Sequence, residues 1–209
     1  MSIISNITTR AIAGLTQADI AGLSTDDIKA ISSTQMAAFT SSQIPYFLDE
    51  QLAVLSTAQI AALTSSQMRG FEIGQLAGLK TSQVRAFETR DLIGLSSAQM
   101  AAFVSSQIAV LTTAQIAGFT GVQFSGIDLN ALAGLTSTQI IAMNSGQLRA
   151  MTSNQVAALS VNQVKAIESR DVVGFTTGQM IALESAQVAA FTTAQIAGLN
   201  SNQIQAIEA

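Results

Sequence analysis

The feature that most constrains this chain is an eight-residue repeat that runs through it without an insertion or a deletion. From Ile7 onward a large apolar residue recurs every eight positions as far as Ile207, which makes twenty-five complete octads over residues 7–206. We number the positions of an octad from 1, the recurring apolar residue, to 8, and the consensus is L-[ST]-[ST]-x-Q-[ILVM]-x-[AG]. A fixed short period predicts an array in which each unit is stable only against its neighbours.

The columns of the repeat differ in how strongly they are constrained. Positions 1 and 6 are always large and apolar, Gln fills position 5 in nineteen octads and Asp in four, and Ala or Gly fills position 8 in all but three. Positions 4 and 7 vary widely, so we expect them to face solvent. Because Ala and Gly exchange freely at position 8, we expect a requirement for small volume there, where successive helices cross, and not for a positive φ.

The period excludes one continuous helix. Eight residues at about 100° each would move the apolar stripe by about 80° per octad, so the stripe would leave any one face within a few repeats. A β-solenoid is the alternative, but positions 1 and 6 would point to opposite faces of one strand, and turn residues are too sparse for a corner in every coil. The pattern therefore favours one short helix per octad.

Ser or Thr at position 2 followed by Gln at position 5 matches the capping box S/T-x-x-Q that starts a helix. In this register positions 1 and 6 are also the pair that a hydrophobic staple joins. A cap at position 3 is the competing register, since Ser or Thr is more frequent there. We keep position 2, and expect the cap to shift to position 3 where position 2 holds Lys80, Glu88, Glu168 or Glu184. The octad of Glu72 has Ile73 at position 3, so we expect a cap at neither position there.

A second period of forty residues orders the exceptions. Acidic residues recur at position 2 as Glu88, Asp128, Glu168 and Glu208, and the segment 88–91 reappears as 168–171. Duplication of a five-octad block explains how this forty-residue period arose. A physical explanation is that five octads make a whole number of superhelical turns, so that charges forty residues apart form columns on one face.

These observations predict an all-α solenoid of short single helices, one per octad, with a five-octad higher-order period. We expect a single elongated repeat domain over residues 1–209, as part of a longer array. A charged fraction of 11% beside 48% hydrophobic residues argues against disorder. No apolar run approaches the roughly 18 residues of a membrane span, and no basic stripe suits nucleic acid. The first residues do not resemble a cleaved signal peptide.

Composition also argues against an enzyme. The chain has no His and no Cys, which removes the usual general base, metal ligand and thiol nucleophile. We expect no cofactor and no metal, and we expect Glu88, Arg90 and Asp91 to pair with one another at a helix end rather than to bind a cation. The candidate interaction surface consists of the basic residues at position 7, which are Lys29, Arg69, Arg149, Arg85 and Lys165.

Octads such as LTTAQIAG at 111–118, LSTAQIAA at 55–62 and FTTAQIAG at 191–198 resemble the octapeptide tracts of very large bacterial surface or secreted proteins of the adhesin type. The resemblance covers residues 7–209. It implies an extracellular or cell-surface location and a role as stalk or spacer, and it implies no ligand. Haem binding, a label that such proteins often carry, finds no axial His or Cys in this sequence.

Two functional hypotheses follow. The first is a non-enzymatic spacer that holds other domains of the same polypeptide apart. The second is an interaction module that binds a protein or a glycan through charged columns on the solenoid. The terminal octads look like internal ones, so we also expect either a longer array or end-to-end association of two copies.

Overall fold

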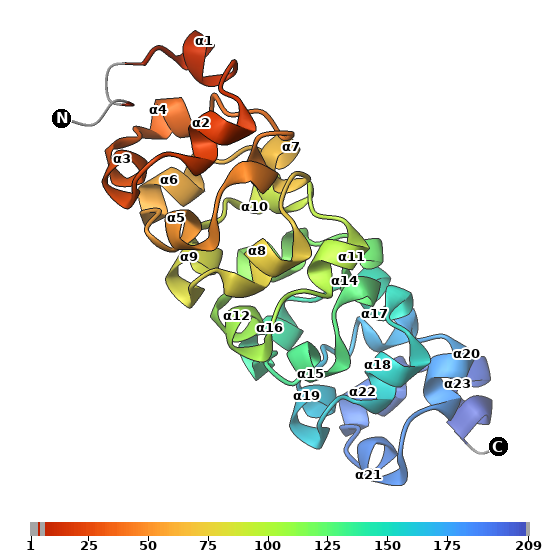
Figure 1. Ribbon diagram of the computed structural model, residues 1–209. Coiled ribbons are helices and arrows are strands. Elements are labelled where there is room, and N and C mark those ends of the chain that lie inside the picture. Colours follow the sequence, from red (N-terminus) through yellow and green to blue (C-terminus); the bar gives the residue numbers. More distant parts are fainter. Residues whose placement is uncertain (1–3, 5–6, 208–209) are drawn as a thin grey trace. The chain divides into compact units, whose positions relative to one another are not determined.

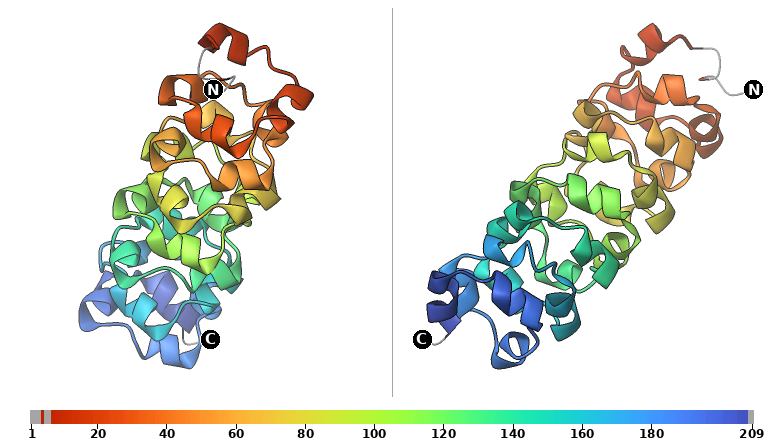
Figure 2. Two further views of the ribbon diagram at one scale, coloured as in Figure 1. Left: turned by 60° about the vertical axis from the view of Figure 1, so that its left-hand side comes forward. Right: turned by 180° about the vertical axis from the view of Figure 1, so that it is seen from behind.

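The computed structural model describes residue 4 and residues 7–207. It divides into two compact units, Met1–Ala102 and Phe103–Ala209. Every described element is a short helix, so the expected all-α class is confirmed and the β-solenoid alternative is wrong for these residues. None of these helices is long and apolar enough to cross a membrane. Within each unit the chain winds as a coil of short helices and extended linkers (Figures 1 and 2).

Each octad contributes one helical element, in register with the repeat. The elements of the first unit are α1 (Thr9–Ile12), α2 (Gln17–Ala21), α3 (Thr25–Ala30), α4 (Ser33–Met36), η2 (Ile44–Tyr46), α5 (Asp49–Ala53), α6 (Thr57–Ala61), α7 (Ser65–Met68), α8 (Ile73–Gly78), α9 (Thr81–Ala86), α10 (Thr89–Leu92) and α11 (Ser97–Met100). Those of the second unit are α12 (Ser105–Val110), α13 (Thr113–Gly118), α14 (Gly121–Gly126), α15 (Leu129–Leu132), α16 (Ser137–Ile141), α17 (Ser145–Ala150), α18 (Ser153–Ala157), α19 (Val161–Ala166), η3 (Val172–Gly174), α20 (Thr177–Ile181), α21 (Ser185–Val188), α22 (Thr193–Gly198) and α23 (Ser201–Ile207).

Position 2 is the N-cap, as the staple argument predicts. In α13 the backbone N–H of Thr112 donates to Gln115 Oε1 at 2.7 Å, and the N–H of Gln115 donates to Thr112 Oγ1 at 3.1 Å. The two bonds satisfy two backbone donors that a helix start leaves unpaired. Positions 1 and 6 are buried through most of the array, whereas position 4 is exposed throughout and position 7 is never buried.

The expected shift of the cap to position 3 is wrong. Glu72, Lys80 and Glu184 are each still the N-cap of their helix, because the Gln at position 5 accepts from their backbone N–H whatever the side chain at position 2 is. These bonds are Glu72 to Gln75 at 3.1 Å, Lys80 to Gln83 at 2.9 Å and Glu184 to Gln187 at 2.8 Å. Glu88 is likewise the N-cap of α10, and the octad of Glu168 forms the 3₁₀ helix η3 instead of an α-helix.

Successive turns stack with an offset of three octads. Helix α6 contacts α9 in the first unit, and α14 contacts α17 in the second, each pair three octads apart. The Gln side chains reach back to the third and fourth octads before their own, so one turn takes between three and four octads. Five octads are therefore not a whole number of turns. The expectation that residues forty apart stack on one face is wrong.

Buried glutamines join each turn to the one before it. Gln59 Nε2 donates to the carbonyl oxygens of Ile28 at 2.7 Å and Ile31 at 2.8 Å, while its Oε1 accepts from the Ser56 N–H at 2.8 Å and from the Ser56 hydroxyl at 3.0 Å. The amide thus uses both of its donors and accepts twice, which is what a buried amide requires. The same bonds, 28 and 31 residues back, recur in both units, for example from Gln99 and from Gln179.

The forty-residue period marks a different joint between turns. Three octads lie forty residues apart and begin at Phe87, Ile127 and Ile167. Their position 5 holds Asp91, Ala131 and Asp171 in place of Gln, and their position 8 is Gly. A Cβ on the glycine would overlap the backbone of the serine three octads earlier; the pairs are Gly94 with Ser65, Gly134 with Ser105 and Gly174 with Ser145. Glycine is therefore required there, so position 8 does not exchange freely. The expected absence of positive φ is confirmed over the described residues.

Candidate functional site

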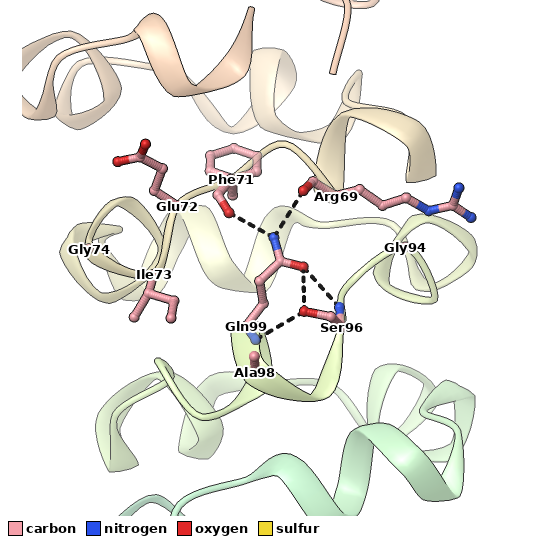
Figure 3. A pocket seen from close by; sticks show the side chains of 9 residues that line it. All are labelled: Arg69, Phe71, Glu72, Ile73, Gly74, Gly94, Ser96, Ala98 and Gln99. Carbon is pink, nitrogen blue, oxygen red and sulfur yellow. Dashed lines mark hydrogen bonds between the residues drawn. The ribbon is translucent and has the colours of Figure 1, made fainter. Parts of the chain in front are cut away.

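A groove in the first unit lies between two octad junctions that stack on one another (Figure 3). One wall is the linker from α7 to α8 and the first residues of α8, and the other is the linker into α11. The groove has a volume of about 770 Å³. It is lined by Arg69, Phe71, Glu72, Ile73, Gly74, Gly94, Ser96, Ala98 and Gln99.

The floor of the groove is a Gln joint. Gln99 Nε2 donates to the carbonyl oxygens of Met68 at 2.9 Å and Phe71 at 2.8 Å. Its Oε1 accepts from the Ser96 N–H at 2.9 Å and from the Ser96 hydroxyl at 3.0 Å. Every polar atom of this amide is engaged, as Figure 3 shows in part, so the floor is rigid and offers a ligand little hydrogen bonding.

The walls differ from the repeat consensus in one octad. Glu72, Ile73 and Gly74 stand at positions 2, 3 and 4, where the consensus has two hydroxyl residues and a variable one. The side chain of Ile73 is left 58% exposed, and Gly74 has no atom within 4 Å of where a Cβ would stand. The result is an apolar, open wall where other octads present hydroxyl groups.

Two opposite charges flank this wall. The side chains of Arg69 and Glu72 extend in opposite directions from the Phe71 segment (Figure 3). Neither forms an ion pair with any residue that the structure describes. The groove therefore has a cation on one side of the Phe71 segment, and an anion together with the exposed Ile73 on the other.

The five basic residues predicted as an interaction surface are exposed at position 7, but they do not form columns. Lys29 lies in α3 and donates to Asp26 at 3.0 Å, and Arg85 lies in α9. Arg149 lies in α17 and Lys165 in α19 of the second unit. No two of the five lie in octads of one unit that are three octads apart. Arg69 alone lines the groove.

The predicted pairing of charges at helix ends is confirmed. Arg90 Nη2 lies 2.7 Å from Glu88 Oε2, and Arg170 Nη2 lies 2.6 Å from Glu168 Oε2. Nowhere in the part of the chain that the structure describes do three acidic side chains gather closely enough to hold a metal ion. These charge pairs are exposed and contribute about 0–1 kcal/mol each.

Sequence reasoning missed the groove, although a signal was present. The octad of Glu72, Ile73 and Gly74 departs from the consensus at three adjacent positions, and we interpreted this only as the loss of a cap. The residues that face this octad across the groove could not be inferred, because the repeat does not show that stacked turns are offset by three octads.

Comparison with known proteins points to one family. The family described as the ALTTAQ repeat matches residues 12–46, 84–121, 124–161, 132–169, 164–201 and 180–209, which together make up more than half of the chain. No curated protein matches the sequence. Among solved structures, the leucine-rich repeat-containing protein LegL7 from Legionella pneumophila is 13% identical over 84% of this chain and 79% of its own, with a TM-score of 0.20. That score is too low to relate the two folds.

Proposed function

Because this chain belongs to the ALTTAQ repeat family, we propose that it is a non-enzymatic structural repeat domain that acts as a spacer within a large bacterial surface or secreted protein. The observation that carries the proposal is the column of buried glutamines. The residues that define the repeat are used to cap helices and to join turns, so the repeat itself encodes a scaffold and not a binding surface.

The energetics of the joints favour a stiff scaffold. The Gln59 amide makes four hydrogen bonds and the Gln83 amide makes three, and each bond contributes about 0.5–1.5 kcal/mol net. Breaking the Gln59 joint would also leave the carbonyl oxygen of Ile31 and the N–H at the helix start without partners, while the carbonyl oxygen of Ile28 would keep only its bond from the Ile31 N–H. Unpaired buried groups of this kind cost more than the bonds themselves. Bending between two turns therefore requires several buried bonds to break together.

The outward positions support the same role. Position 4 is exposed in every octad, and its residues range from Ala through Asn to Arg. A surface with so little in common from one repeat to the next suits a function that depends on length and stiffness. The extracellular or cell-surface location is part of the proposal and rests on the resemblance of the octads.

Distances between spin labels test the spacer role within each unit. The sequence contains no Cys, so pairs of cysteines can be introduced for labelling without a background. We choose T34C/S82C in the first unit and A114C/N162C in the second, because all four sites are exposed position-4 residues and both pairs span six octads. A spacer is expected to give one narrow distance distribution for each pair, with similar means.

Two results would contradict the spacer proposal. One is a broad distribution in either unit under conditions in which circular dichroism shows a folded helical protein. The other is turnover of any substrate by the purified chain. A urea-unfolded sample of each labelled pair is the control, since it sets the width that a flexible chain of the same length produces.

Peptide binding in the groove is a second candidate, favoured by the exposed Ile73, which lies on the same side of the Phe71 segment as Glu72 and opposite Arg69. The chain offers a matched control eighty residues later, where Thr152, Ser153 and Asn154 replace the three wall residues. Peptides selected from a random phage-displayed library on the intact chain should lose at least about tenfold in affinity on E72T/I73S/G74N. Peptides that bind this variant as well as the wild type would exclude the groove as their site.

A further inference from the structure

The place that corresponds to the groove in the second unit lies eighty residues later in the chain. Three residues that frame the groove are identical there, and the pairs are Arg69 and Arg149, Gly94 and Gly174, and Gln99 and Gln179. Positions 2, 3 and 4 of the wall octad differ, since Glu72, Ile73 and Gly74 give way to Thr152, Ser153 and Asn154. In the first unit a carboxylate, an aliphatic side chain and a glycine thus stand in place of two hydroxyl groups and an amide.

In the second unit a hydroxyl at position 3 connects two turns across this place. Ser153 Oγ donates to the carbonyl oxygen of Gly178 at 3.4 Å. The first unit has the same bond elsewhere, from Ser33 Oγ to the carbonyl oxygen of Ala58 at 3.2 Å. In both pairs the acceptor follows the donor by 25 residues, so the bond belongs to the way in which the turns stack.

Ile73 removes this bond from the groove. The residue that follows it by the same spacing is Ala98, which lies on the opposite wall, and an aliphatic side chain has no proton to donate to its carbonyl oxygen. Ile73 is 58% exposed and Ala98 is exposed as well. No atom lies within 4 Å of where a Cβ of Gly74 would stand. The groove is thus open between an apolar side chain and a backbone acceptor.

Glu72 adds a second acceptor on the same side of the Phe71 segment as Ile73 (Figure 3). Its carboxylate is exposed and forms no ion pair with any residue that the structure describes. A carboxylate and a carbonyl oxygen beside an aliphatic surface match a Lys or Arg side chain, whose N–H groups require acceptors and whose methylene stem is apolar. The three changes in this octad therefore favour one kind of ligand group.

Arg69 does not favour the opposite kind of ligand to the same degree. Its side chain extends from the Phe71 segment on the side away from Glu72 (Figure 3). The second unit keeps this base as Arg149, although its wall octad is different, so the base is not what distinguishes the groove. The whole chain has a net charge of −4, and long-range attraction therefore also favours a basic partner.

We propose that the groove binds a peptide segment of a partner protein through one Lys or Arg side chain of that segment. The stem of this side chain lies on Ile73, and its cationic group donates to the carboxylate of Glu72 and to the carbonyl oxygen of Ala98. This rests on peptide binding in the groove, the second candidate function, and adds the class of side chain that the groove selects. The second unit has no such site, since Thr152 and Ser153 provide neither the carboxylate nor the aliphatic surface.

Peptides selected from a random phage-displayed library on the intact chain are the probes. They are expected to contain Lys or Arg, and replacing that residue by Gln in the synthetic peptide should weaken binding at least about tenfold in fluorescence anisotropy. E72Q and I73S should each have a similar effect, because the first removes the charge and the second restores the hydroxyl. The matched control is E184Q, which changes another exposed glutamate at position 2 and should leave the affinity unchanged.

Transfer of the wall to the second unit is the converse test. The variant T152E/S153I/N154G receives the three residues of the first unit, with Arg149 already in place and the carbonyl oxygen of Gly178 as the backbone acceptor. Isothermal titration calorimetry with a selected peptide should then find two binding sites per chain in place of one. A folded transfer variant that still binds one peptide would contradict the proposal.

Three further outcomes would decide against it. Peptides that lack basic residues, or that bind E72Q as well as the wild type, but are lost on E72T/I73S/G74N would overturn the basic ligand and leave peptide binding in the groove intact. A larger loss on R69Q than on E72Q would indicate an acidic ligand and overturn it too. Binding that survives in E72T/I73S/G74N would exclude the groove altogether.

The fold of each variant is checked by circular dichroism. The capping box at Glu72 uses the backbone N–H of this residue, which donates to Gln75 Oε1 at 3.1 Å, so E72Q should keep the helical content and thermal midpoint of the wild type. If the transfer variant does not fold, E72Q and I73S decide on their own. Unchanged affinity in both would then overturn the proposal.

Discussion

This molecule has two kinds of joint between turns, and their hydrogen bonds run in opposite directions. At Gln59 a side-chain amide donates to two carbonyl oxygens where the preceding turn ends a helix. At Asp91 a carboxylate accepts, at 2.9 Å, from the N–H of Ser65, where the preceding turn begins a helix. Asp171 and Ser145 repeat the second joint in the other unit, also at 2.9 Å.

The difference shows which part of a joint the array depends on. A short helix leaves unpaired carbonyls at one end and unpaired amides at the other, and each joint satisfies one of these ends from the next turn. The Gln joint also forms the capping box of its own helix, so it has two tasks. The Asp joint has one task. Gly94 beside it lies close to the backbone of Ser65, as Gly70 and Gly198 of two Gln octads lie close to the serine three octads earlier.

The largest expected effect comes from changing the polarity of a Gln joint. Q59E is nearly isosteric but aims a carboxylate at the carbonyl oxygens of Ile28 and Ile31, so it should lower the free energy of unfolding by about 3–5 kcal/mol near neutral pH. Chemical denaturation followed by circular dichroism measures this. Q17E, at an exposed position 3, is the control and should change stability by less than about 0.5 kcal/mol. Equal losses would show that the amide donors are unimportant.

The next effect tests the glycine of the Asp joint. G94A would place a Cβ against the carbonyl of Ser65 and should destabilise the first unit by roughly 1–3 kcal/mol. At Gly78, the last residue of α8, no atom lies within 4 Å of where a Cβ would stand. G78A should therefore leave the stability of the fold unchanged or raise it by up to about 1 kcal/mol. Thermal unfolding of the two variants in the same buffer measures the difference between their stabilities. A G94A protein as stable as G78A would contradict the close approach.

Removing the carboxylate itself should have a smaller effect. D91A leaves the N–H of Ser65 without its acceptor and should cost about 1–2 kcal/mol. The loss stays moderate because Ala131 occupies the same place in the related octad forty residues later. D91N keeps an acceptor and should cost less than D91A. A loss for D91A as large as that for Q59E would mean that the two joints do not differ in the way described.

The smallest effect concerns pH and the box that Asp19 closes. The hydrogen bonds from the Thr16 hydroxyl and N–H lower the pKa of Asp19 below its ordinary value. A lowered pKa in the folded state stabilises the fold above the ordinary pKa, and this contribution is lost as the pH falls through the lowered value. In an NMR titration T16V should move the Asp19 pKa toward its ordinary value. The capping box of Ser32 and Gln35 contains no carboxylate, so its hydrogen bonds should not change as the pH passes through the pKa of Asp19.

Local features of the fold could be predicted from the repeat because an octad contains everything that they require. The capping box and the alternation of apolar and variable positions lie within eight residues, so the helix starts and the exposed positions 4 and 7 were predictable. The cap missed at Glu72 and the cap misplaced at Lys80 came from considering only the side chains at positions 2 and 3. The Gln at position 5 holds the helix start from its other side.

Longer-range features could not be predicted, because nearly identical octads do not reveal which of them stack. The second task of Gln59 depends on carbonyls 28 and 31 residues away, and no pattern in the sequence specifies that offset. The forty-residue period was visible, but it marks joints such as those of Asp91 and Asp171, not columns of charge. The groove at Ile73 was hidden for the same reason, since its second wall comes from the next turn.

Buried Gln side chains donate hydrogen bonds from one turn to the carbonyls of the turn before. Side-chain amide hydrogen exchange, measured by NMR, tests it most directly, with the exposed Gln17 and Gln205 as internal references. We expect the Nε2 protons of Gln59, Gln67 and Gln179 to exchange far more slowly than those of the two references, and to show couplings to the carbonyl carbons that they meet. Exchange of the buried amides as fast as that of Gln17 would contradict it.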